Sequence, residues 1–405
     1  MTIRLKKPLV YVTRDIERAL GLEPGGMYFV ISNNTEYGRE IKKQYPENVW
    51  LIDTKPNGEL LDTFELLSLP LVGQAILEHK ADVLVFKNTG QIERLSKERG
   101  WNLLNPRAYL SKMVEEKISQ VAWLKKDANL LPPHKITLLK KVKYDKKKFI
   151  LQFNHSHTGE GTYIIDSLET LEDLKEKFPE RECRIVNFID GPVLTLNIVV
   201  GFWTLLGSPS YQITGLKPFT DLPLSTIGND WSLPLSDEFT DTDIKRIKDI
   251  AKKIARRMRF SGWKGLFGID LIKDSLTSAM YLLEINARQP ASVSYESKLQ
   301  SDADFETTIF DAHIASILGK SFPLWRLKTI SGGAQIIQRI TKKQTVFDTK
   351  KLETKLGVKN CTVIPYEKGD YNKEYYRIQS EKGVMEGHDK FNELGNFISS
   401  CIQQK

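Results

Sequence analysis

Short apolar runs alternate with longer amphipathic segments along the first hundred residues of the chain. Runs rich in Val, Ile, Tyr and Phe predict buried strands at 9–12, 27–32, 49–53 and 82–87. A helical pattern covers 62–79, between the third and fourth runs. Alternation of strands and helices is typical of a parallel sheet with helices on both faces. The N-terminal part is therefore predicted to be an α/β domain.

The pattern changes after this first domain. An apolar stripe at three-to-four spacing predicts one helix over 110–127. Two pairs of apolar runs follow, over 147–166 and 183–200, and each pair encloses turn residues, so both predict strand pairs. A last hairpin is predicted over 265–290, and the residues from about 331 onward resemble a small α+β module.

Length and charge set broad limits on what the protein does. A chain of 405 residues is too long for one typical core and indicates two or three packed units. The formal net charge of +8 suits anionic ligands such as nucleotides and carboxylates, and it also suits weak nucleic-acid binding. The basic helix predicted over 241–259 lacks interleaved aromatic residues, so an ordinary solvated face explains it better than base stacking.

Cysteine and apolar segments restrict the cellular location. The cysteines, Cys183, Cys361 and Cys401, are far apart and form no CxxC pair, which argues against a disulfide framework and a structural zinc site. The apolar run near the N-terminus is too short for a signal peptide. No apolar segment reaches the roughly 18 residues of a membrane span. We therefore expect a cytoplasmic protein.

The hairpin over 265–290 holds the strongest candidate chemistry. Asp270 lies on its first strand, and Glu284 and Asn286 lie on its second. A turn centred near Thr277 places Asp270 opposite Glu284, at about 5 Å between Cβ atoms. Side chains alternate along a strand, so Glu284, Asn286 and Arg288 are expected on one face.

Two carboxylates so close together repel each other unless something compensates their charge. Mg²⁺ does so, because it binds carboxylate and carbonyl oxygens and keeps positions for phosphates. Arg288 could then clamp a phosphate or a carboxylate. A solvated hairpin with a surface salt bridge would explain the same residues, although the apolar flanks at 266–267 and 282–283 favour the metal site.

A second signal is the polar loop at 154–161, which carries two glycines, Gly159 and Gly161, between two apolar runs. Glycine lets a backbone approach phosphates and donate N–H groups to them, but a lone GxG is a weak signal, and a flexible turn explains the loop better. His155 and His157 form an HxH pair in this loop. No further His or Cys lies nearby in the sequence, so we expect them in a lid and not in a metal site.

Taken in order, these elements resemble the ATP-grasp superfamily over about residues 1–340. An acidic residue followed on the next strand by E-x-N-x-R closes the family's site, and Asp270, Glu284, Asn286 and Arg288 match it. The resemblance implies that the first three hold Mg²⁺, or Mn²⁺, which bridges the phosphates of ATP. It also implies that Arg288 contacts phosphate or substrate.

The family's nucleotide contacts map onto further residues. The resemblance implies a phosphate-binding lysine before the small domain, a glycine-rich loop and an adenine-binding strand; the matching residues are Lys117, Gln152, Thr158, Gly159, Glu160, Gly161, Thr162, Asn187 and Ile189. Two of the family's positions differ. Its second lysine aligns with Gln152, and the glutamate before its adenine linker aligns with Val186.

The resemblance also implies the fold class and the domain limits. It predicts a multidomain α/β and α+β chain, with a Rossmann-like pre-ATP-grasp domain at 1–110. An ATP-grasp domain then covers 111–330, with a small nucleotide-lid subdomain at about 130–190 and a larger metal and substrate part at about 191–330. A C-terminal module at 331–405 completes the chain.

The implied activity is ligation. ATP phosphorylates a small-molecule carboxylate, and an amine then attacks the acyl phosphate and releases phosphate. Alternatives are an ATP-grasp carboxylase that uses bicarbonate, a non-catalytic nucleotide-binding regulator and, from the charge alone, a nucleic-acid-binding protein. We expect no nucleic acid and no membrane as partners, and homodimers are common in the family. The segment 208–234 is a candidate substrate loop, with Lys217, Asn229 and Asp230 as candidate contacts.

Overall fold

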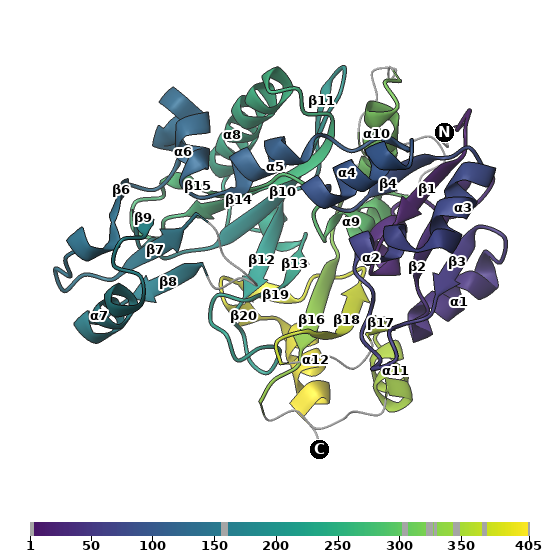
Figure 1. Ribbon diagram of the computed structural model, residues 1–405. Coiled ribbons are helices and arrows are strands. Elements are labelled where there is room, and N and C mark those ends of the chain that lie inside the picture. Colours follow the sequence, from purple (N-terminus) through teal and green to yellow (C-terminus); the bar gives the residue numbers. More distant parts are fainter. Residues whose placement is uncertain are drawn as a thin grey trace.

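The computed structural model describes residues 4–154, 161–301, 307–320, 327, 330–342, 349–366 and 371–403 (Figure 1). The expectations for His155, His157, Thr158, Gly159 and Glu160 lie outside these residues. Within the described ranges, no helix has the length and the apolar composition that crossing a membrane requires.

The first domain is built on a parallel sheet with the strand order β3-β2-β1-β4-β5. Its strands are β1 (Leu9–Val12), β2 (Tyr28–Asn33), β3 (Val49–Ile52), β4 (Asp82–Val85) and β5 (Asn102–Leu103). Its helices are η1 (Ile16–Ala19), α1 (Glu36–Gln44), α2 (Thr63–Ser68), α3 (Pro70–Glu78) and α4 (Gly90–Glu98). Leu9 and Tyr11 pack into one core and Val10 and Val12 into another, so helices cover both faces of the sheet.

The single helix expected over 62–79 is wrong, because the chain divides it at Leu69. Leu69 has extended backbone angles (φ −65°, ψ 132°) and precedes Pro70. The proline ring clashes with a helical residue before it, so α2 ends and α3 begins at this point.

A small antiparallel sheet has the order β6-β9-β7-β8. Its elements are β6 (His134–Leu138), η3 (Leu139–Lys141), β7 (Phe149–Phe153), β8 (Thr162–Ile165), α7 (Leu168–Lys177) and β9 (Glu182–Asn187). Leu151, Phe153 and Cys183 form a core with Leu171 and Leu174 of α7. Because side chains alternate along a strand, the opposite face of this sheet is left for other contacts.

The large sheet has the order β15-β14-β10-β12-β13-β16-β18-β17, with β11 beside β10. Its strands are β10 (Val193–Val200), β11 (Thr204–Leu206), β12 (Ser210–Thr214), β13 (Thr226–Asp230), β14 (Gly265–Lys273), β15 (Met280–Asn286), β16 (Ala334–Arg339), β17 (Thr362–Pro365) and β18 (Glu374–Ser380). The residues after 331 thus extend this sheet, because β16 pairs with β13.

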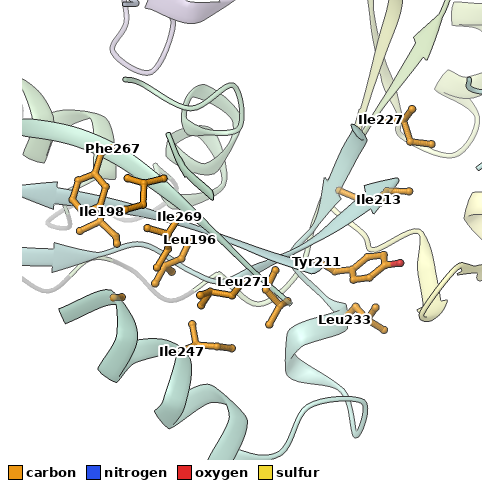
Figure 2. Close-up of a cluster of buried hydrophobic side chains, with 14 of the residues drawn as sticks. Leu196, Ile198, Tyr211, Ile213, Ile227, Leu233, Ile247, Phe267, Ile269 and Leu271 are labelled. Carbon is orange, nitrogen blue, oxygen red and sulfur yellow. The ribbon is translucent and has the colours of Figure 1, made fainter. Parts of the chain in front are cut away.

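Helices complete the packing around the large sheet. They are α5 (Ala108–Glu115), α6 (Ser119–Leu124), η2 (Lys125–Leu130), η4 (Leu233–Leu235), α8 (Asp241–Phe260), α9 (Val293–Gln300), α10 (Ile309–Ile317), α11 (Thr349–Gly357) and α12 (Glu393–Gln403). Two short strands, β19 (Met385–Gly387) and β20 (Lys390–Phe391), pair with each other. Figure 2 shows Ile247 of α8 beside Leu196 and Leu271 of the sheet. The basic side chains of α8 therefore lie on its solvated face, as its pattern predicts.

A buried carboxyl group, Glu296 of α9, ties the large sheet to the helices behind it. Its Oε2 accepts a hydrogen bond from Asn197 Nδ2 at 2.6 Å, and its Oε1 accepts one from the backbone N–H of Ser208 at 2.8 Å. Burial raises the pKa of Glu296 to about 7, and these hydrogen bonds only partly oppose the shift. The folded protein therefore binds the proton of Glu296 more tightly than the unfolded chain does.

We predict that Glu296→Gln becomes more stable relative to the wild type as the pH rises from 5 to 8. A raised pKa in the folded state means that wild-type stability falls between the unfolded pKa, near 4.5, and the folded pKa, near 7. Glutamine does not titrate, so the difference in unfolding free energy should move by on the order of 1 to 3 kcal/mol in its favour. Urea unfolding at several pH values measures it, and a constant difference would contradict the prediction.

Candidate active site

The hairpin of β14 and β15 brings the predicted metal residues together. Asp270 pairs with Glu284, and Gly268 pairs with Asn286, so the predicted cross-strand pairing is confirmed. The register shifts next to this pair, because Leu271 pairs with Leu282 and leaves Leu283 as an extra residue. A β-bulge of this kind inserts one residue into one strand. Without it, the turn would place Leu283 opposite Asp270.

Asp270 is buried and held by two donors. Thr195 Oγ1 donates to its Oδ1 at 2.7 Å, and Asn286 Nδ2 donates to its Oδ2 at 3.0 Å. Burial, and then the charge of Glu284, raise the pKa of Asp270 to about 6, against the opposing effect of these hydrogen bonds. Since the amide nitrogen of Asn286 faces Asp270, its carbonyl oxygen points elsewhere and is the atom it can offer to a cation.

Lys117 compensates Glu284 directly. Its Nζ lies 3.1 Å from Glu284 Oε1. Burial acts to raise the pKa of Glu284, but Lys117 and Arg288 outweigh it, so the pKa lies below its usual value. Glu284 is therefore ionised at neutral pH, beside an Asp270 that gives up its proton only near pH 6.

The position of Lys117 depends on a break in the helix that the sequence predicts over 110–127. That prediction is wrong: α5 ends at Glu115, Glu116 has extended backbone angles (φ −68°, ψ 131°), and α6 begins at Ser119. Lys117 lies in the break.

Asn154, at the end of β7, stabilises the broken backbone from the small sheet. Its Oδ1 accepts hydrogen bonds from the N–H groups of Ile118 (2.9 Å) and Ser119 (3.3 Å). Its Nδ2 donates to Glu116 Oε2 at 2.8 Å. The side chain thus replaces the helical partners that these backbone groups lose at the break.

Arg288 lies two residues beyond the end of β15, in a cluster with Glu115 and Lys87. Its Nη1 is 2.6 Å from Glu115 Oε1, and Lys87 Nζ is 2.5 Å from Glu115 Oε2. A small pocket lies here, lined by residues that include Phe86, Lys87, Asn105, Ser111, Arg288 and Gln289. The sequence analysis did not select Lys87, although it follows a buried parallel strand, where ligands of open α/β sheets bind.

The nucleotide-binding residues expected on the small sheet lie on two adjacent strands. Gln152 of β7 pairs with Arg184 of β9 on one side and with Thr162 of β8 on the other. Both the Nε and the Nη2 of Arg184 donate to Gln152 Oε1, at 2.9 and 2.7 Å. Arg184 was missed in the sequence, where nothing distinguishes it from the other polar residues of β9.

Three other residues expected to contact the nucleotide are Asn187, Ile189 and Gly161. The N–H of Asn187 donates to the carbonyl oxygen of Pro133 at 3.0 Å, so this group cannot reach an adenine, and Ile189 lies just beyond β9. The carbonyl oxygen of Gly161 accepts from the N–H of Phe153 at 2.9 Å and closes the glycine-rich hairpin.

The expectation that Asp230 contacts substrate is wrong. It is fully buried, and its carboxylate accepts hydrogen bonds from the backbone N–H groups of four residues, namely Ser232, Leu233, Val384 and Met385. Asn229 is also buried, where its Nδ2 donates to Ser210 Oγ at 3.1 Å. Both side chains join the large sheet to the residues that follow it.

In the part of the chain that the structure describes, His, Cys, Asp and Glu side chains nowhere gather in groups of three or more that could hold a metal ion. The predicted metal site therefore depends on two carboxylates, Asp270 and Glu284, together with the amide oxygen of Asn286. The arrangement suits a cation that phosphate oxygens coordinate further, such as Mg²⁺.

Comparison with known proteins identifies the fold. No protein-family model matches the chain, and no curated protein matches its sequence. An N5-carboxyaminoimidazole synthetase from Staphylococcus aureus has a TM-score of 0.65 at 13% identity, over 100% of this chain and 99% of that one. The N5-carboxyaminoimidazole synthase from Aspergillus clavatus gives 0.68 at 15% identity, over 98% of each chain. The chain has the ATP-grasp fold.

A biotin carboxylase from Campylobacter jejuni is a further neighbour, with a TM-score of 0.64 at 13% identity, over 93% of this chain and 88% of that one. The multidomain fold class expected from the sequence is thus confirmed across the whole chain. Within the ATP-grasp fold, the small sheet and the β14–β15 hairpin are neighbours (Figure 1), and Lys117 and Asn154 make the contacts that join them.

We predict that Thr195→Val destabilises the protein at pH 8, where Asp270 is ionised. Valine keeps the shape of threonine but removes the donor to a buried carboxylate, which costs about 1 to 3 kcal/mol. Thr195→Ser keeps the hydroxyl and should lose much less. Urea unfolding monitored by tryptophan fluorescence measures both variants, and equal stability of the valine variant and the wild type would refute the role given to Thr195.

Proposed function

We propose that the protein is an ATP-dependent ligase that activates a carboxylate as an acyl phosphate and couples it to an amine, with ADP and phosphate as products. One observation carries the proposal: in an ATP-grasp fold, Asp270 and Glu284 face each other across a hairpin, with Asn286 next to Asp270 and Lys117 on Glu284. Two adjacent carboxylates repel each other and destabilise a hairpin, so their pairing favours a role in binding a cation over a purely structural role.

Asp270, Glu284 and Asn286 are the residues that would hold Mg²⁺ or Mn²⁺. Their donor atoms fit such an ion, because all are oxygens and the carboxylates repel each other in its absence. When bound, the ion would neutralise the charge that spreads over the phosphoryl oxygens during transfer. Lys117, whose Nζ lies 3.1 Å from Glu284 Oε1, would add positive charge at the same place.

Lys117, Gln152, Gly161, Thr162, Asn187 and Ile189, with Thr158, Gly159 and Glu160 of the glycine-rich loop, are proposed to bind ATP. The Aspergillus clavatus neighbour was solved with ADP and 5-aminoimidazole ribonucleotide, and a Staphylococcus aureus enzyme was solved with ADP. These structures support nucleotide binding by a chain of this fold. For Asn187 the contact would have to exclude its N–H group, which is already bound.

The carboxylate substrate is proposed to bind near Arg288 and Lys87. Both cations contact one carboxylate, that of Glu115, so the cluster carries an excess of one positive charge. A second carboxylate would find a partner there, and Arg288 can hold it in two parallel hydrogen bonds. The position lies just beyond Asn286, where a phosphoryl group held by the metal residues could reach it.

A carboxylase that uses bicarbonate as the carboxylate is the second candidate. The likeness to a biotin carboxylase supports it, as does the small size of the pocket beside Arg288. The two candidates share the phosphorylation step and differ only in the acid. Phosphate release with bicarbonate as the sole acid would favour the carboxylase, and release that requires an organic acid would favour the amide ligase.

We predict that Glu284→Gln abolishes Mg²⁺-dependent phosphate release from ATP while the fold is retained. The substitution removes one of two proposed metal carboxylates, and losses on the order of 10² to 10³ follow the removal of such charge-stabilising groups. The assay screens pools of small carboxylates, amino acids, amines and bicarbonate.

Glu182→Gln, at an exposed position on β9, is the matched control for that experiment and should keep wild-type rates. Normal turnover by a folded Glu284→Gln variant would exclude the assignment. Binding of ATP without release in any pool would instead support a nucleotide-binding regulator.

A further inference from the structure

Arg184 is a buried cation that has no carboxylate partner among the described residues. It is 3% exposed, and its hydrogen bonds within this part of the chain end on the amide oxygens of Gln152 and Gln120. Arg377, which is also buried, shows the usual solution, since its Nη2 lies 2.9 Å from Glu374 Oε2. An unpaired buried charge is unfavourable, so an anion bound near Arg184 would stabilise it.

The contacts of Arg184 fix the orientation of Gln152. A guanidinium has donors and no acceptor, so the oxygen of the Gln152 amide must face Arg184. The NH₂ group of Gln152 must then point away from it. In the described part of the chain this NH₂ group has no acceptor, and Gln152 is only partly buried.

Gln120 holds the guanidinium from the other side. Its Oε1 accepts from Arg184 Nη1 at 3.2 Å, while its Nε2 donates to the carbonyl oxygen of Val114 at 3.0 Å. The arginine is thus clamped between two amide oxygens. Neither amide neutralises its charge, and burial lowers the pKa of Arg184 only to about 10, so the group stays charged at neutral pH.

The free NH₂ group lies on the side of the small sheet that faces the candidate site. The neighbouring side chains of Leu151, Phe153 and Cys183 point to the other face, into the core with α7. Gln120, which accepts a hydrogen bond from Arg184, lies three residues after Lys117, whose Nζ is 3.1 Å from Glu284 Oε1. These contacts connect the Gln152–Arg184 pair to the proposed metal residues.

We propose that Gln152 donates its amide N–H groups to a phosphate of the bound nucleotide, and that Arg184 is a positioning residue that orients this amide and supplies positive charge behind it. This inference rests on the proposed function and assigns recognition of the phosphate chain to a glutamine–arginine pair. It also accounts for the neutral residue at position 152, because the cation is supplied from the adjacent strand.

The decisive variant is Gln152→Glu, which keeps the size of the side chain. Glutamate loses the N–H donors and forms an ion pair with Arg184, so the fold should be as stable as the wild type or more stable. Affinity for ATP with Mg²⁺ should fall at least about tenfold, the effect of losing one charge-assisted hydrogen bond. Affinity for adenosine, which has no phosphate, should not change.

Isothermal titration of the full chain with ATP and with adenosine measures these affinities, and thermal unfolding measures stability. Gln44→Glu, on the exposed surface of α1, controls for the added negative charge and should bind ATP as the wild type does. Arg184→Gln should also weaken ATP binding. Adding Gln152→Lys to Arg184→Gln should restore most of it, because the charge is returned to the same place.

The possible results separate the inference from the proposed function. Unchanged ATP affinity in a folded Gln152→Glu variant would overturn the inference alone. Equal losses for ATP and adenosine would also overturn it, since the pair would then act only on the shape of the sheet. If the wild type itself binds no ATP, both the proposed function and the inference fail.

Discussion

The repulsion between Asp270 and Glu284 is the constraint around which the candidate site is organised. The two carboxyl groups are accommodated in different ways. Burial and the charge of Glu284 raise the pKa of Asp270, and two hydrogen-bond donors hold its oxygens. The ammonium of Lys117 stabilises the charge of Glu284. Because only Glu284 is fully paired with a cationic side chain and Asp270 can bind a proton, the two groups can lie together in the folded protein without a metal ion. Their oxygens can still serve as ligands when a metal ion binds.

Bringing Lys117 to Glu284 explains several features that otherwise look unrelated. The helix must break after Glu115, and the break leaves backbone groups that need partners. Asn154 provides them from the small sheet. The same contacts therefore place the lysine and join the small sheet to the helices beside the large one.

Positive charge around the site comes from four parts of the chain. Lys87 follows β4 of the first parallel sheet, and Lys117 lies in the break between α5 and α6. Arg288 lies just beyond β15, and Arg184 lies on β9 of the small sheet. Glu115 offsets part of it, by contacting both Lys87 and Arg288. A site assembled from separate elements in this way suits an anionic ligand that lies across all of them, as a nucleotide with an acid beside it would.

The sequence by itself determined the features that depend on local periodicity and on short spacing. Alternating runs predicted the first parallel sheet, and the spacing within the last hairpin predicted that Asp270 faces Glu284. The order of these elements was enough to indicate the ATP-grasp fold. Such patterns are visible because strand and helix periods are repeated within a few residues.

Only the tertiary structure decided the features that depend on contacts between distant residues. The bulge at Leu283 keeps Asp270 and Glu284 in register, the side chain of Asn154 stabilises the break before Lys117, and Arg184 turns the amide of Gln152. Asp230, which the sequence suggested as a substrate contact, instead accepts hydrogen bonds from backbone N–H groups of residues 232–233 and 384–385. A hydrogen bond between residues far apart in the chain leaves no periodic trace in the sequence, so only the folded chain reveals it.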